Sequence, residues 1–264
     1  MADLTHFDPN SAGNPNNNIF GLPFNQEESR VILLPVPWEV SVSYAAGTAR
    51  APENIFQASM QVDLIDNDIH DGWKRGIFMK DIDNEVLRKS DYLRKEAELY
   101  IKYVTEGQAI EDNKFMCKVL REINEGGVFL NEWVYENTKT LLNQGKLVGL
   151  LGGDHSSPLG FYKAIGEKYP SFAILQIDAH ADLREAYEGI TYSHASIMYN
   201  ALKEVPSINK LVQVGTRDYS ESEWNYIKNS NGKVVTFFDR DLKERQYEGT
   251  LWKHIVEQIV QELP

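Results

Sequence analysis

The sequence contains little that would suit an exported or membrane-bound protein. It has one cysteine, Cys117, among 264 residues, so no disulfide can form within the chain. Its start, residues 1–18, has neither the basic flank nor the apolar core of a signal peptide. No apolar run approaches the roughly 20 residues that span a bilayer. We therefore expect a reducing, cytoplasmic location and a Cys117 thiol that fills the core of a helical segment.

Positive charge is also scarce. Lysine and arginine number 27 against 39 aspartates and glutamates, which gives a formal net charge of −12. No basic patch is interleaved with aromatic residues, so the pattern argues against a nucleic-acid partner. An acidic chain instead favours a small cationic substrate through long-range electrostatics.

Short apolar runs alternate with helical patterns over the second half of the chain. Strands are predicted at 147–151, 172–177, 211–214 and 234–238, after an earlier strand and its exit at 31–38. Strands separated by helices imply a mostly parallel sheet covered on both faces, which is an α/β fold. The pattern ends on a helix at about 251–262, and a further strand is expected after it.

The length fits one large α/β domain, 1–264, with an insertion. Between about 70 and 145 apolar residues such as Val86 and Leu93 recur at helical spacing. Three helices are predicted there: Asp81 and Asp83 mark the start of the first, and the last covers 129–143. We interpret this segment as a helical insertion with no chemistry of its own.

Two segments place acids and histidines at predicted strand ends. One reads Gly-Gly-Asp-His-Ser at 152–156, and the other reads Asp-Ala-His-Ala-Asp at 178–182. In open α/β sheets the carboxyl ends of the strands are where ligands bind. The Asp-Ala-His-Ala-Asp segment alone would favour capping and turn chemistry. The occurrence of both segments at two successive strand ends instead favours a shared metal site.

The spacing in the second segment constrains its path. In an extended strand Asp178, His180 and Asp182 would share one face, but the two carboxylates would be about 13 Å apart. One ion cannot span that distance, so we expect the chain to leave the extended path near His180 and to bring Asp182 back. Two ions that share Asp178 would also fit, since the ions of two-metal hydrolases lie about 3.5–4 Å apart. Carboxylates with imidazole suit Mn²⁺, Fe²⁺, Zn²⁺ or Co²⁺, and a carboxylate-rich site favours Mn²⁺.

The combined pattern resembles the arginase–agmatinase family, the ureohydrolases, over about 150–218, with weaker similarity at 31–53. The resemblance implies an arginase-like three-layer fold around a mostly parallel sheet. It implies that His155, Asp178 and Asp182 bind one Mn²⁺, while Asp178 and His180 reach a second. His194, in Tyr-Ser-His-Ala-Ser at 192–196, matches a histidine that the family uses for proton transfer.

The segments around 182–195 look closer to agmatinases than to arginases. The implied reaction is hydrolysis of agmatine to urea and putrescine. Arginase, guanidinobutyrase and formiminoglutamase of the same family are alternatives. Family members commonly form trimers or hexamers, so the resemblance also implies a homo-oligomer.

The C-terminal part of the family pattern is missing. In the family a later strand carries an Asp-x-Asp pair that completes the dinuclear site, and a later glutamate faces the guanidinium group. Asp239-Arg240-Asp241 has the right letters, but we predict that it lies on the surface. We therefore expect a fold without its C-terminal strands, with uncovered apolar surface. A non-catalytic metal-binding or assembly module is the alternative from another functional class.

Overall fold

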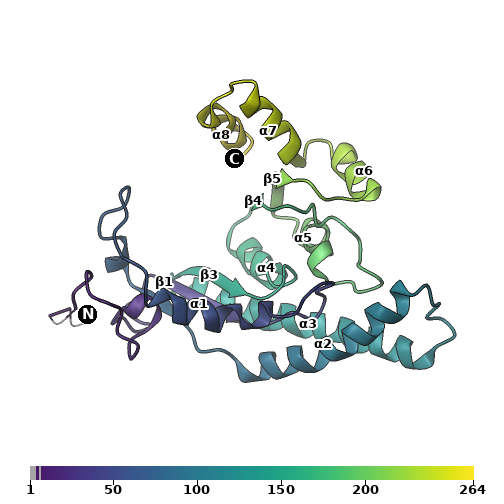
Figure 1. Cartoon of the computed structure of the whole chain (residues 1–264), viewed down its shortest axis with the longest axis horizontal. Helices are drawn as coiled ribbons and strands as arrows, with labels where there is room; N and C mark the ends of the chain where they lie inside the picture. Colours follow the sequence, from purple (N-terminus) through teal and green to yellow (C-terminus); the bar gives the residue numbers. More distant parts are fainter. Residues whose placement is uncertain (1–3, 6) are drawn as a thin grey trace. The chain divides into compact units, whose positions relative to one another are not determined.

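The computed structural model describes residues 4–5 and 7–264. The chain forms two compact units, Met1–Gly160 and Phe161–Pro264. Each unit contains a three-stranded parallel sheet (Figure 1). The α/β class and the parallel strands predicted from the sequence are thus confirmed.

In the first unit β1 (Val31–Val36) is the central strand, between β2 (Ile77–Met79) and β3 (Leu147–Gly152). Both pairings are parallel. The apolar runs predicted as strands at 31–38 and 147–151 form β1 and β3. The short strand β2 was not predicted, because three residues are too few to display a period.

The α-helices that accompany this sheet are α1 (Ala51–Ser59), α2 (Asn84–Thr105) and α3 (Lys114–Asn143). The carboxylate of Asp83 caps α2 by accepting hydrogen bonds from the amides of Glu85 and Val86. Asn113 caps α3 in the same way. Short 3₁₀ turns occur at Ile19–Gly21, Thr48–Arg50 and Gly72–Arg75.

The segment at 70–145 differs from its prediction in two respects. It contains β2, so it is not wholly helical. The second and third predicted helices are one continuous helix, α3. Gly126 lies within this helix, where an added Cβ would come 2.2 Å from Cδ1 of Leu93 on α2. The glycine therefore permits close helix packing rather than ending the helix.

The prediction for Cys117 was wrong. Its side chain is exposed on α3, and its Sγ lies 3.1 Å from the carbonyl oxygen of Ile110. The buried face of the helix instead contains Met116 and Val119. A helical pattern alone does not tell which side of an apolar stripe faces a partner.

In the second unit β5 (Ile208–Thr216) is central, between β4 (Phe172–Ile177) and β6 (Val234–Phe238). Its helices are α4 (Leu159–Lys168, which begins at the end of the first unit), α5 (Ile197–Glu204), α6 (Glu221–Asn229), α7 (Asp239–Tyr247) and α8 (Trp252–Gln261), with a 3₁₀ turn at His194–Ser196. One sheet face packs on α7 and α8 through a core that consists of Val212, Val214, Leu242, Ile255 and Ile259.

Asp239 and Asp241 lie in the first turn of α7, where acidic groups interact favourably with the helix dipole. Arg240 and Asp241 are exposed. The prediction that the Asp-Arg-Asp triplet lies on the surface is therefore confirmed for Arg240 and Asp241, while Asp239 is half-buried. Among the described residues no helix combines the length and the low polarity that crossing a membrane requires.

Candidate metal centre

The ligand loop, residues 178–182, leaves the carboxyl end of β4 in the second unit. The amide of Asp178 still bonds the carbonyl of Val214 on β5, at 3.1 Å. The carbonyl of Ala179 accepts hydrogen bonds from the amides of Arg217 and Asp218, at 2.8 and 3.0 Å. The loop therefore starts in register with the exit of β5, and His180 pairs with Asp218 in a parallel bridge.

Asp178 and His180 turn their ligand atoms toward each other. The amide of His180 donates to Oδ1 of Asp178 at 2.8 Å, which holds the carboxylate against the loop. The imidazole Nδ1 lies 3.3 Å from the same oxygen. Two ligands of one ion, each about 2.1 Å from it at a right angle, lie about 3 Å apart. The spacing of Asp178 and His180 therefore fits a shared divalent cation.

Asp182 lies close to Asp178, although four residues of extended chain would separate them widely. An oxygen of each carboxylate lies within 4.8 Å of the other. The backbone of Asp182 has a left-handed φ of 54°, which ends the extended path after His180. The predicted departure from a straight strand is confirmed.

Two further contacts fix the loop as it turns. The carbonyl of Asp182 accepts hydrogen bonds from the amides of Met198 and Tyr199 at the start of α5, at 3.0 and 3.3 Å. The next amide, that of Leu183, donates to Oε1 of Glu223 at 3.0 Å. Because Asp182 is only 5% exposed, its carboxylate is held in a largely water-excluded position.

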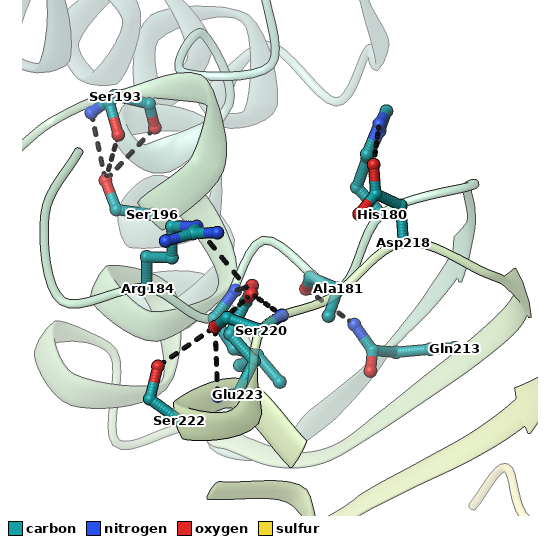
Figure 2. Close-up of polar contacts among 11 residues, drawn as sticks. His180, Ala181, Arg184, Ser193, Ser196, Gln213, Asp218, Ser220, Ser222 and Glu223 are labelled. Atoms are coloured by element: carbon teal, nitrogen blue, oxygen red, sulfur yellow. Dashed lines mark hydrogen bonds and ion pairs between the residues drawn. The ribbon is translucent and has the colours of Figure 1, made fainter. Parts of the chain in front are cut away.

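Glu223 is a buried carboxylate that the sequence analysis did not identify. Its Oε2 accepts hydrogen bonds from the amide and the hydroxyl of Ser220, at 2.7 and 2.8 Å, in the capping box of α6. Arg184 Nε lies 3.7 Å from the same oxygen (Figure 2). Glu223 thus ties the exit of the ligand loop to the start of α6. The Ser-x-x-Glu spacing was the signal that could have indicated it.

Asp218 is a second residue that the sequence analysis missed. Its Oδ2 lies 3.9 Å from Nε2 of His180 (Figure 2). The other ring nitrogen of His180, Nδ1, lies 3.3 Å from Oδ1 of Asp178. Metal-binding histidines usually present their second ring nitrogen to a carboxylate or a carbonyl. The signal for Asp218 was its position directly after the strand that neighbours β4.

His194 lies in the 3₁₀ turn that precedes α5. Ser193 and Ser196 cap this turn, and their hydroxyl oxygens are 2.8 Å apart. The ring of Tyr187 lies 5.5 Å from that of His194, centroid to centroid. The imidazole therefore lies beside an aromatic ring, and the capped turn fixes the backbone of His194.

Tyr162 on α4 has a strongly perturbed hydroxyl. Burial raises its pKa to about 12, and the negative charge of Asp182 adds to this effect. The phenol therefore stays neutral in the folded protein through the physiological range.

The segment at 152–156 belongs to the first unit and follows β3. Gly153 is required there, because a Cβ would come 1.9 Å from the carbonyl oxygen of Trp38. The buried carboxylate of Asp154 accepts hydrogen bonds from Ser156, through Oδ1, and from the amide and hydroxyl of Ser41, through Oδ2. Asp154 therefore stabilises the turn that carries His155. The predicted ligands thus follow β3 in the first unit and β4 in the second.

Comparison with known proteins identifies the family of the chain. The family model described as Arginase family matches residues 29–263. The N(1)-aminopropylagmatine ureohydrolase of Thermus thermophilus is 31% identical over 192 residues, which cover 72% of this chain and 52% of that protein. The agmatinase of Bacillus anthracis is 29% identical over a match that covers 80% of this chain and 60% of that protein.

Among solved structures, the agmatine ureohydrolase of Thermoplasma volcanium superposes with a TM-score of 0.62 at 18% identity. The match covers 91% of this chain and 66% of that one. At this identity the likeness concerns the fold alone. This chain spans between about half and two thirds of the length of these relatives. Since the family model matches most of the sequence, the chain belongs to the arginase family.

Proposed function

We propose that this chain takes part in the metal-dependent hydrolysis of a guanidino compound, with agmatine as the favoured substrate and urea and putrescine as products. The observation that carries the proposal is the approach of Asp178 and Asp182 at the exit of β4, where an oxygen of each carboxylate lies within 4.8 Å of the other, with His180 beside Asp178. Two of the relatives carry the names agmatinase and N(1)-aminopropylagmatine ureohydrolase, which supports a guanidino substrate. The net charge of −12 favours a cation such as agmatine.

The proposed metal ligands are His155, Asp178, His180 and Asp182, and the proposed metal is Mn²⁺. The 3.3 Å separation between Asp178 Oδ1 and His180 Nδ1 supports a shared ion. Carboxylate and imidazole ligands without a thiolate suit Mn²⁺ better than a closed Zn²⁺ site. When bound, two divalent ions supply a nucleophile at neutral pH, because they lower the pKa of water.

The side chains of this chain have separate roles in the proposal. Asp178 would hold the metal together with His180, because its Oδ1 lies 3.3 Å from the imidazole Nδ1. Asp182 is buried, so its charge is poorly screened by water and attracts a cation strongly. His194 passes a proton to the departing amine, which leaves poorly unless it is protonated.

A non-catalytic role is the second candidate function, and one observation favours it. The Asp-x-Asp sequence, Asp239 to Asp241, directly follows β6, an outer strand of the second sheet, and forms the first turn of α7. The second pair of carboxylates that the family resemblance implies is therefore not found at that place. A metal-binding or assembly module would need only the ligands near 155 and 178–182. Assembly as a trimer or hexamer and the single-domain organisation of 1–264 stay predictions.

The test is metal binding and product release by the purified chain. Calorimetry with Mn²⁺ is paired with product analysis on agmatine, arginine, guanidinobutyrate and formiminoglutamate. Asp178→Asn is the test variant, and His254→Ala, which changes an exposed histidine on α8, is the matched control. We expect Mn²⁺ binding and urea release from agmatine that Asp178→Asn abolishes and His254→Ala preserves.

The other outcomes separate the candidates. Mn²⁺ binding that depends on Asp178, without turnover of any of the four compounds, would favour the binding module. Faster turnover of another guanidino compound would overturn agmatine as the substrate. A folded chain that binds no Mn²⁺ would overturn both candidate functions.

A further inference from the structure

Three polar side chains form a row across the interior of the second sheet. Gln176 on β4, Gln213 on β5 and Thr236 on β6 are register partners. Gln213 is fully buried and Gln176 almost so. Burying amides is costly unless their hydrogen bonds are satisfied, so a sheet interior normally contains apolar residues. A row of three polar residues at one level therefore needs an explanation.

The hydrogen bonds of this polar row lead to the ligand loop. Nε2 of Gln213 donates to the carbonyl oxygen of Ala181 and to Oε1 of Gln176, each at 2.7 Å. Nε2 of Gln176 donates in turn to the carbonyl oxygen of His180 at 3.3 Å. Figure 2 shows Gln213 reaching from its strand to Ala181. Two successive carbonyls of the loop are thus held by two glutamine side chains.

Thr236 completes the row without touching the loop. Its hydroxyl donates to Oε1 of Gln213 at 2.8 Å. The Gln213 amide keeps its orientation without this bond. Its Nε2 donates to two oxygens, those of Gln176 and Ala181, and neither oxygen could donate to the amide if it were turned round. Loss of the Thr236 hydroxyl would remove a buried donor from the Gln213 oxygen, but it would leave the contact with Ala181 in place.

We propose that Gln213, assisted by Gln176, is a positioning residue for the metal ligands, and this inference rests on the proposed metal site. The carbonyls of His180 and Ala181 lie between the ligands His180 and Asp182. Asp182 has a left-handed backbone, a conformation that costs free energy in a residue with a side chain and persists where the surroundings enforce it. The two glutamine amides supply that constraint from the strand side.

The geometry argues for a positioning role over simple stabilisation. An apolar residue at 213 would suit the sheet interior equally well, but it would leave the carbonyl of Ala181 without its buried donor. The loop could then recover a partner only by moving toward water. Such a movement would displace the carboxylate of Asp182, which follows directly, and would weaken its share of a metal site.

The experiment compares Gln213→Met with Thr236→Val in the full chain. Both variants remove a buried hydrogen bond of the row, but only the first releases the loop. Mn²⁺ affinity is measured by calorimetry, and Co²⁺ is used as a second probe, because its visible absorption reports ligand geometry. Hydrogen exchange at the amides of Met198 and Tyr199, which bond the carbonyl of Asp182, reports the loop without metal. Urea unfolding gives the stability of each variant.

For Gln213→Met we expect about tenfold weaker Mn²⁺ binding, a changed Co²⁺ spectrum and faster exchange at Met198 and Tyr199. Thr236→Val should keep all three near the unmodified values while losing stability. Equal effects of both variants, or unchanged binding and exchange in Gln213→Met, would overturn the positioning role. Failure of the proposed reaction would look different, since it would appear as metal binding without turnover in the unmodified chain. An unmodified chain that binds no Mn²⁺ would overturn both.

Discussion

The imidazole Nε2 of His180 lies 3.9 Å from Oδ2 of Asp218, so a carboxylate from the neighbouring strand exit stands beside the ring of a proposed ligand. We expect Asp218→Asn to weaken Mn²⁺ binding by about tenfold, because loss of a carboxylate behind a metal-binding histidine typically lowers metal affinity by at least that factor. Calorimetry with Asp218→Asn and with Asp241→Asn, an exposed acid on α7, tests this. Equal affinities of the two variants would mean that Asp218 acts only through overall charge.

Gly153 should not tolerate any side chain. An added Cβ would lie 1.9 Å from the carbonyl oxygen of Trp38, which belongs to the backbone and cannot turn away. We expect Gly153→Ala to lower the free energy of unfolding by about 3 kcal/mol, at the upper end of overpacking costs. Gly72→Ala is the control, since its nearest neighbour is a side-chain methyl at 3.3 Å. Urea unfolding of both variants measures the difference, and equal midpoints would contradict the prediction.

The raised pKa of the Tyr162 hydroxyl should make the folded chain lose stability in alkaline solution. The pKa of its hydroxyl is about 12 in the folded chain, against 10.0 for an unperturbed tyrosine. Below about pH 10 both states keep the proton, so the effect is absent. Between about pH 10 and 12 the unfolded chain ionises first and binds fewer protons, so stability falls as pH rises.

Thermal unfolding across this pH interval tests the assignment. Tyr162→Phe should unfold with a smaller drop in melting temperature between about pH 9.5 and 11.5 than the unmodified chain. Tyr192 and Tyr226, whose pKa values burial also raises, should account for the remaining drop. Tyr92→Phe, which changes an exposed ring, is the control. An identical pH profile for Tyr162→Phe would remove Tyr162 as a cause.

The outer strand β4 should make the chain prone to association. Ile177 is 80% exposed and Leu175 is 44% exposed on that strand. Exposed apolar side chains on an outer strand favour pairing with other chains. We expect Ile177→Thr, which keeps a β-branched side chain, to lower the binding of a hydrophobic dye and to slow aggregation measured by light scattering. Val62→Thr, at an exposed position in the first unit, is the control, and an equal response of the two variants would count against β4 as the cause.

The sequence predicted those parts of the site that depend on local order along the chain. The strand-end positions of 152–156 and 178–182, and the turn that brings Asp182 back, followed from apolar runs and from the reach of an extended chain. The roles of Asp218, Glu223 and Gln213 did not follow. The strand-end position of Asp218 and the capping spacing of Glu223 indicate where these residues lie along the chain. What each of the three contacts depends on the register between distant segments, which leaves no mark in a single sequence.

The errors in the helical region have the same origin. The exposure of Cys117 depends on which face of α3 meets α2. The glycine at 126 within the continuous helix α3 reflects the close approach of Leu93 from α2. Neither contact is local. The cap at Asp83, by contrast, involves residues two and three positions away, and the sequence predicted that helix start correctly.

The left-handed backbone of Asp182 places folding and the proposed metal site in opposition at a single position. This conformation costs free energy in a residue with a side chain. Asp182→Gly would remove that cost and should yield a metal-free chain that melts at a higher temperature but lacks a proposed ligand. Selection or engineering for thermostability alone would therefore drift toward losing this carboxylate. Any stabilising screen of this protein needs a metal-dependent readout alongside the melting temperature.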